Sequence, residues 1–261
     1  MSINRRDFLK IAGLSTIVGL GGMSTAIGLR KNVEASQIMR DPEALTAKRW
    51  AMVVNMSKFK DIENIKKIAA ACHREHNVPT VENKKHEIKW LWPEKFEHAL
   101  PEQEDEYLAE EIKDSYVPLL CNHCDNPPCV RVCPTQATYK RPDGIVMMDM
   151  HRCIGCRFCM AACPFGARSF NYKDPRKLDP GLEKNLEFPT RMRGVVQKCT
   201  LCYERLAVGL EPACVKESNG ALIFGDLDDP HSEVRKVLEE HYSIRRKPEL
   251  GTKPSVYYIF G

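Results

Sequence analysis

The sequence lacks the features that mark several common function classes. It has no Gly-rich phosphate loop and no catalytic constellation, and its eight histidines are scattered. Its 39 basic and 35 acidic side chains nearly balance, which argues against nucleic-acid binding by charge. Beyond residue 29, no apolar run is long enough to cross a bilayer. None of these absences argues against a redox function, and the cysteine content indicates one.

Twelve cysteines form two complete runs and one incomplete set. Residues 121–134 read Cys-x2-Cys-x4-Cys-x3-Cys-Pro, and residues 153–164 read Cys-x2-Cys-x2-Cys-x3-Cys-Pro. The second is the run of bacterial ferredoxins, in which three thiolates hold one [4Fe–4S] cluster and the fourth reaches the neighbouring cluster. The two runs therefore form an internal repeat.

The two runs predict two interlaced metal sites. Three cysteines on one loop cover three corners of a cube, and we expect the fourth cysteine to start a short helix that points away, with the following proline limiting that helix. The first predicted site comprises Cys121, Cys124, Cys129 and Cys163. The second comprises Cys133, Cys153, Cys156 and Cys159. The incomplete set comprises Cys199, Cys202 and Cys214, and Cys72 is the only cysteine left to complete it.

Two other uses of these cysteines have to be weighed. A disulfide framework suits an exported protein, and zinc ribbons also use Cys-x2-Cys pairs. Two proline-terminated runs and a pairing that uses all twelve thiols favour three [4Fe–4S] clusters instead.

Several motifs resemble one protein family over roughly residues 45–261. They are the segments 121–129 (CNHCDNPPC), 153–164 (CIGCRFCMAACP), 198–203 (KCTLCY) and 220–226 (GALIFGD). The chain is similar to the four-cluster electron-transfer subunits of membrane redox complexes, such as the iron–sulfur subunits of polysulfide, tetrathionate and nitrite reductases. The expected fold is α+β, with tandem bacterial-ferredoxin-like modules whose short strands and helices are organised around the clusters.

The resemblance also implies that a fourth site has been lost. A first cysteine run in the family precedes a segment like residues 72–79, and counting back from Cys72 by the spacing of that run gives three isoleucines. These are Ile62, Ile65 and Ile68. Four residues after Cys214, where the family has a further cysteine followed by proline, this chain has Ser218 and Asn219. We expect isoleucines on one face of a helix begun by Asp61 to fill the space, although an ordinary helix core explains the same stripe.

The N-terminus resembles a twin-arginine export signal. Residues 4–10 (NRRDFLK) precede an apolar stretch from 11 to about 29, and we expect a signal peptide over residues 1–35. An ordinary signal anchor is the alternative, because the stretch is long enough to span a bilayer. The mature domain, residues 36–261, is expected on the outer (periplasmic or extracytoplasmic) face of the cytoplasmic membrane. Membrane contact is expected through a partner or a retained signal.

The resemblance implies an electron-transfer subunit with no catalytic residues of its own. Its expected partners are an NrfD-like, quinone-reactive integral membrane subunit and a cytochrome c or other redox subunit, in a complex for which menaquinol is a candidate substrate. Three clusters, an export signal and a missing first site are similar to the subunits of the DsrMKJOP (Hme) complexes associated with sulfite reduction. The alternative is the iron–sulfur subunit of a molybdopterin oxidoreductase.

The remaining patterns predict local structure. Helices are expected at 61–75 and 231–241, and strands at 50–56, 138–140, 145–149, 194–197, 221–224 and 253–260. Residues 80–118 read as a charged insertion with an acidic helix at 102–112, which is typical of a solvated element. Its tryptophans, Trp90 and Trp92, make a partner-docking surface the alternative.

Four polar residues lie beside predicted ligands. Lys198, Arg152 and Arg157 are expected to raise cluster potentials, with plain solubility as the alternative. His123, between Cys121 and Cys124, is expected to be a supporting or surface residue and not a ligand.

Overall fold

The computed structural model describes residues 41–59, 61–178 and 184–260, which all belong to one unit of the chain. The predicted export signal at 1–35 and the start of the predicted mature domain lie outside the described residues. None of the helices in the described ranges is long and apolar enough to cross a membrane.

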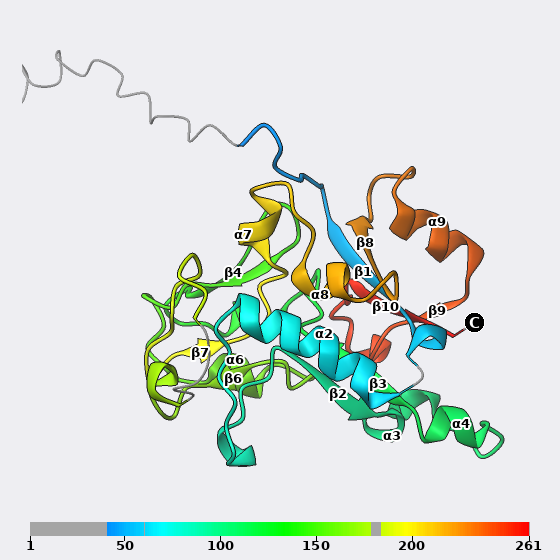
Figure 1. Ribbon diagram of the computed structural model, residues 1–261, viewed down its shortest axis with the longest axis horizontal. Helices are drawn as coiled ribbons and strands as arrows, with labels where there is room; N and C mark the ends of the chain where they lie inside the picture. The colour runs from blue at the N-terminus through cyan, green and yellow to red at the C-terminus, as the bar shows by residue number, and fades with distance from the viewer. Residues whose placement is uncertain (1–40, 60, 179–183, 261) are drawn as a thin grey trace, which may run out of the picture. The chain divides into compact units, whose positions relative to one another are not determined.

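A four-stranded sheet forms one end of this unit (Figure 1). Its strands, in spatial order, are β8 (Leu222–Asp226), β1 (Trp50–Asn55), β10 (Val256–Ile259) and β9 (Ser243–Ile244). Strand β1 pairs parallel with β10 and antiparallel with β8. Because successive side chains of a strand point to opposite faces, Met52 and Val54 enter the main core, whereas Ala51 and Val53 pack with α9 (Glu233–Glu240). The sheet is therefore covered on both faces.

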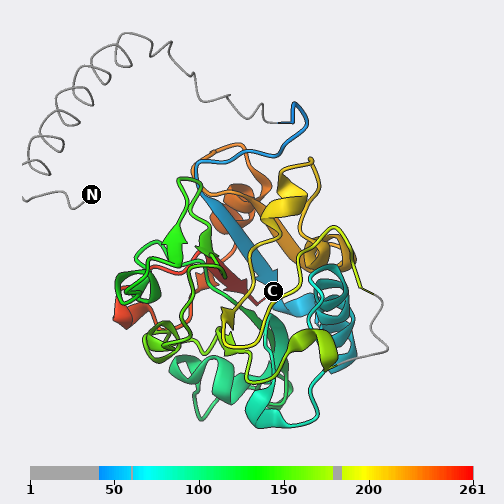
Figure 2. The ribbon, with the colours of Figure 1, turned by 90° about the vertical axis from the view of Figure 1, so that its left-hand side faces the viewer.

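Helix α2 (Ile62–Glu75) begins where the sequence predicted. The Asp61 side chain accepts a hydrogen bond from the backbone N–H of Asn64 at 2.9 Å, which caps the helix. Helix α2 packs beside α8 (Ala213–Glu217) and against β2 (Leu91–Lys95), and both views show α2 and α8 side by side (Figures 1 and 2). Helix α2 thus joins the N-terminal part of the unit to segments far away in the sequence.

The two ends of the segment 80–118 belong to the core, which corrects the expectation of a solvated element for them, whereas residues 101–111 are largely exposed as expected. Strand β2 pairs antiparallel with β3 (Tyr116–Leu120), and both Trp90 and Trp92 are buried. The tryptophans therefore offer no exposed docking surface. The acidic helix expected at 102–112 is wrong: only short helices form, and they are α3 (Phe96–Ala99), η3 (Pro101–Gln103) and α4 (Glu110–Lys113).

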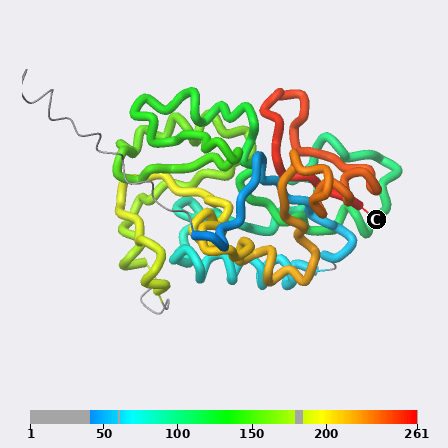
Figure 3. Tube along the Cα trace, turned by 90° about the horizontal axis from the view of Figure 1, so that it is seen from above, coloured from blue at the N-terminus to red at the C-terminus, as the bar shows by residue number. Residues whose placement is uncertain are grey.

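The two cysteine runs lie at the other end of the unit, drawn in green to yellow-green in Figure 3. They carry the hairpin β4 (Thr138–Lys140)/β5 (Val146–Met148), with Gly144 in the turn at φ +84°, as predicted. A second pair joins β6 (Ser169–Phe170) to β7 (Val196–Gln197). The remaining short helices are α5 (Pro128–Arg131), α6 (Phe158–Ala161), α7 (Tyr203–Leu206), η1 (Met56–Lys58), η2 (Lys84–His86), η4 (Pro175–Lys177) and η5 (Pro248–Leu250).

The short helix of each run is placed differently from the prediction. It contains the third cysteine, Cys129 in α5 and Cys159 in α6, and ends before the fourth. Cys133 and Cys163 each precede a proline, which disfavours the helical conformation of the residue before it. The fourth cysteine of each run therefore leaves the helix, and it does not begin one.

Candidate metal centres

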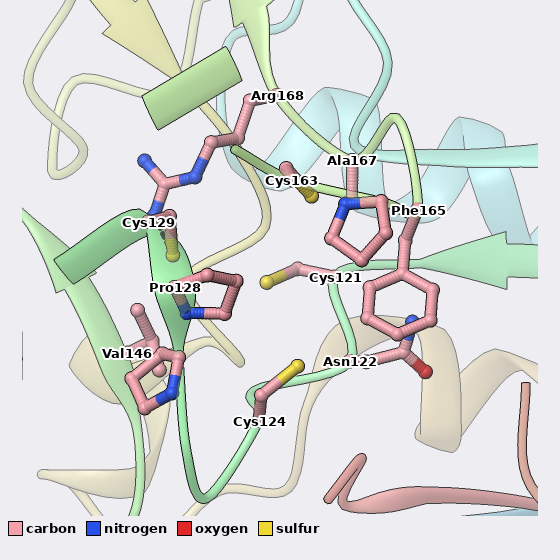
Figure 4. Close-up of a pocket in the computed structure, with 12 residues that line it drawn as sticks. Cys121, Asn122, Cys124, Pro128, Cys129, Val146, Cys163, Phe165, Ala167 and Arg168 are labelled. Carbon is pink, nitrogen blue, oxygen red and sulfur yellow. Dashed lines mark hydrogen bonds between the residues drawn. The ribbon is translucent and has the colours of Figure 1, made fainter. Parts of the chain in front are cut away.

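The first predicted set gathers around one cavity. Cys121, Cys124, Cys129 and Cys163 line it, together with Pro128 and Arg168 (Figure 4). Cys121 follows β3, Cys129 lies on α5 and Cys163 comes after α6. The sulfur atoms face the same space, although Cys163 belongs to the other run. The structure thus brings together the interlaced set that the spacing predicts.

The pKa values of two thiols in this set are shifted in opposite directions. Burial, with the nearby thiolate of Cys121, raises the pKa of Cys124 to about 12. Burial also opposes ionisation of Cys121, but Lys198 and His123 hold its pKa well below the usual range. Four thiolates around one cavity, three of them buried, repel one another unless a cation lies between them. The donor set therefore fits a metal group, whose positive charge removes the thiol protons.

The second set lies nearest the surface. Cys133, Cys153 and Cys159 contact the same small apolar cluster, whereas Cys156 is exposed. Two large apolar side chains beside these cysteines, Ile154 and Phe158, are 67% and 59% exposed. The loop of this set depends on Gly155, which has a φ of +72° and where a Cβ atom would collide with the carbonyl oxygen of Gly194.

The third set joins the two halves of the sequence. Cys72 ends the buried stretch of α2, and it lies close enough to Cys214 and Cys199 for their charges to interact. Cys202 interacts with the same three thiols, and all four residues are buried. Burial raises the pKa of Cys199 to about 12 and of Cys214 to about 11. Like the first set, this one needs a positive group to hold four thiolates.

Polar side chains surround the third set. His76 Nε2 lies 2.6 Å from Glu204 Oε1, and His76 Nδ1 lies 3.8 Å from the sulfur of Cys72. The ligand atoms of His76, Cys202 and Glu204 lie within 4.8 Å of one another and could hold a single metal ion. Because Cys202 is also one of the four gathered thiols, this trio is not a separate site.

Arg191 is a buried cation beside the third set. Its guanidinium is buried beside Cys72, and it donates a hydrogen bond to the carbonyl oxygen of His76. Its Nε and Nη2 atoms have no hydrogen-bond partner. Burial lowers its pKa to about 9, while Cys72 and Glu204 act in the opposite direction, so the cation persists at neutral pH. A buried cation with unpaired donors fits an anionic group at this position.

The predicted lost site lies one helical turn from the third set. Ile65 and Ile68 are buried in the core, whereas Ile62 is only partly buried. Ser218 donates its hydroxyl to the Val215 carbonyl at 2.7 Å. An open cavity of about 210 Å³ remains between α2 and α8. It is lined by Lys58, Phe59, Asn64, Lys67, Ile68, Glu217, Ser218, Asn219 and Ala221. The isoleucines therefore fill part of the space and leave part open.

The charged neighbours of the cysteines differ in burial. Lys198 is 0% exposed, so the alternative of plain solubility is wrong for it, whereas Arg152 and Arg157 are exposed. His123 is buried, and its Nδ1 accepts the backbone N–H of Val146 at 3.1 Å, which makes it a supporting residue and not a surface one. Sequence reasoning missed Arg168, whose position five residues after Cys163 was its only signal.

Comparisons with known proteins agree with this chemistry. A family model described as a 4Fe-4S dicluster domain matches residues 112–179. The Hdr-like menaquinol oxidoreductase iron-sulfur subunit 1 of Archaeoglobus fulgidus is 40% identical, over 98% of this chain and 97% of that protein. The menaquinone reductase iron-sulfur cluster-binding subunit of Nitratidesulfovibrio vulgaris is 34% identical, over 81% and 88%.

A third relative matches a shorter part. A tetrathionate reductase subunit of Salmonella typhimurium is 44% identical, over 58% of this chain and 54% of that protein. The near full-length match to the Archaeoglobus protein and the dicluster domain lead to the same assignment. This chain belongs to the family of [4Fe–4S] electron-transfer subunits of oxidoreductases.

Proposed function

We propose that this chain holds three [4Fe–4S] clusters and serves as the electron path between an NrfD-like, quinone-reactive membrane subunit and a cytochrome c or other redox partner. A bound cluster of this kind accepts and returns one electron at a time. The observations that support the proposal are the gathered thiols of the first and third sets and the apolar cluster shared by three thiols of the second, with isoleucines and a serine where a fourth site is expected.

The proposed ligand sets are the three that the spacing of the cysteines predicts. Cys121, Cys124, Cys129 and Cys163 hold one cluster; Cys133, Cys153, Cys156 and Cys159 hold the second; and Cys72, Cys199, Cys202 and Cys214 hold the third. Interaction between Cys199 and Cys121 places the third set next to the first, and Arg168 contacts both the first and the second. These contacts support the order second, first, third for the proposed sites.

We further propose that the chain is a DsrO (HmeA) type subunit, linked to dissimilatory sulfite or sulfur metabolism. Its similarity to a menaquinol oxidoreductase subunit along nearly the whole chain supports this, as does the loss of one site. The twin-arginine pattern supports a position on the outer face of the cytoplasmic membrane, attached through a partner or a retained signal.

The alternative proposal is an iron–sulfur subunit of a molybdopterin oxidoreductase. The match to the tetrathionate reductase protein favours it, although that match covers only 58% of this chain. Purification of the native complex separates the two proposals. Co-purification of a polytopic membrane subunit and a multihaem cytochrome supports the first, and a large molybdopterin-containing subunit contradicts it.

The cluster number has its own test. Iron analysis of the anaerobically purified chain should give about twelve irons, four for each of three cubanes. A value near sixteen, with a fourth cubane signal in EPR spectra, would show that other residues had replaced the missing thiolates. A value near eight would show that one of the three sets holds no cluster.

A further inference from the structure

Three of the buried cations in the described part of the chain lie against the cysteine sets. Lys198, Arg191 and Arg168 are 0%, 2% and 5% exposed, respectively. They come from different segments, and Arg191 lies outside the cluster motifs recognised in the sequence. Buried cations are costly unless negative charge lies nearby, so their shared position needs an explanation.

Arg168 lies between the first and second sets. Its Nη2 lies 3.0 Å from the sulfur of Cys129, and its Nη1 donates to the hydroxyl of Thr138 at 3.1 Å. The guanidinium is also close enough to interact with Cys159, which belongs to the second set. One cation therefore acts on ligands of two sites.

Lys198 occupies the equivalent place between the first and third sets. Its Nζ donates to the carbonyl oxygens of Cys199, at 2.7 Å, and Val146. Its charge also acts on Cys121 in the first set and on Cys199 in the third. Because no water reaches this side chain, its charge is screened far less than that of an exposed lysine.

Arg191 lies beside the third set. Its charge acts on Cys72, and its guanidinium lies 4.6 Å from the ring centre of Trp90 and 5.0 Å from that of Phe188. The aromatic rings hold the cation in place without neutralising it. Its Nε and Nη2 remain free of protein hydrogen bonds.

We propose that Arg168, Lys198 and Arg191 form a series of buried cations that alternates with the clusters and raises their reduction potentials. This inference rests on the proposed three-cluster function. A cubane with four thiolates is negatively charged, and each added electron makes it more so. A buried cation stabilises that added charge, and a cation between two clusters also weakens the repulsion between their electrons.

The test is potentiometric titration, followed by EPR, of cluster-loaded protein carrying Arg168→Gln, Lys198→Met or Arg191→Gln. Each signal is first assigned to its set by replacing one cysteine of that set. Arg168→Gln should lower the reduction potentials of the first and second clusters. Lys198→Met should lower those of the first and third clusters. Arg191→Gln should lower that of the third cluster alone. The expected effect is at least tenfold in the reduction equilibrium, which is 59 mV for one electron.

Arg152→Gln is the matched control. Arg152 adjoins Cys153, but its side chain is 65% exposed and pairs with Asp149, so its removal should change no potential by that amount. Arg168→Lys keeps the charge and should keep the potentials close to those of the unmodified protein.

The outcomes separate the two proposals. If the unmodified chain does not show three clusters, the proposed function fails. If three clusters are present and the variants titrate like the unmodified protein, or Arg168→Lys shifts as far as Arg168→Gln, the cation series is wrong. If Arg168→Gln loses iron, the proposal requires that Arg168→Lys still binds it. Loss of iron from both variants would contradict the proposal, because it would show that the site needs the shape of arginine and not its charge.

Discussion

At both ends of the α2–α8 pair, one residue of α2 faces one residue at or just after α8. The facing side chains are thiols at one end and an alkyl group with a hydroxyl at the other. At one end, Cys72 of α2 lies near Cys214 of α8. One turn back along α2 is Ile68, one turn forward from Cys214 is Ser218 at the end of α8, and these two residues line the same cavity. The two helices therefore run antiparallel, and their residues meet as two successive pairs. The first pair offers thiols to a metal, and the second offers an alkyl group and a hydroxyl that is already hydrogen-bonded.

One helix pair is thus held together by different interactions at its two ends. At the cysteine end, buried thiols from segments more than a hundred residues apart in the sequence lie together, and the proposed third cluster would join them. At the isoleucine end, Ile65 and Ile68 contribute apolar burial, and Lys67 pairs with Glu217 at 3.0 Å across the opening. Removing a thiolate should therefore lower the iron content of the protein. Removing an isoleucine should lower only its stability, through lost packing.

The largest effect is expected from Cys72→Ala. Loss of this ligand should lower the iron content from about twelve to about eight per chain and remove one EPR signal. It should also release α2 from the C-terminal half, at a cost of about 5 kcal/mol if the metal acts as a cross-link closing a loop of more than about a hundred residues. Three intact clusters and an unchanged unfolding midpoint would mean that Cys72 is only a buried apolar residue.

Cys163→Ser should damage a cluster of the other run. Because Cys163 faces the cavity of Cys121, Cys124 and Cys129, the signal of that set should be lost or converted, while the signal of the Cys153 set remains. EPR and Mössbauer spectra of the anaerobic protein measure this. Cys133→Ser is the matched variant and should give the reverse pattern. Loss of the Cys153 set in the Cys163 variant would reject the interlaced arrangement.

Ile65→Ala should destabilise the isoleucine end while sparing the clusters. Truncating a fully buried isoleucine costs about 2–4 kcal/mol through lost burial and the cavity left behind, so the midpoint of anaerobic thermal unfolding should fall with the iron content unchanged. Ile62→Ala, at a partly exposed position, should cost less. Ile65→Cys should gain no iron, since one thiolate cannot hold a cube. A new cluster signal in that variant would contradict the loss of the fourth site.

The smallest effect is expected at the start of α2. Asp61→Ala removes the side chain that accepts the Asn64 N–H and should cost about 1 kcal/mol, with all three clusters retained. Glu63→Gln is a suitable control, because its pairing with Lys66 is exposed and should contribute less than about half of that. Equal shifts of the unfolding midpoint in both variants would show that the cap has no special role.

Local signals predicted much of the fold. Helix α2 with its Asp61 cap, the β4–β5 hairpin and the central strand β1 each depend on neighbouring residues, so spacing and turn residues were enough. The β2–β3 pair was missed because its strands are separated by a charged stretch that hides the pairing. The tryptophans of that segment looked available to a partner, whereas the fold uses them as core.

The sequence by itself determined the chemistry of the sites, because cluster ligation needs thiolates at short fixed spacings and those spacings are written in the runs at 121–134 and 153–164. Only the tertiary structure decided what lies next to each set. Arg168 and Arg191 carry no local motif, and they reach Cys129 and Cys72 because separate segments pack together. The electrostatic field at a buried site is the sum of charges from all surrounding segments, and that sum exists only once the chain has folded.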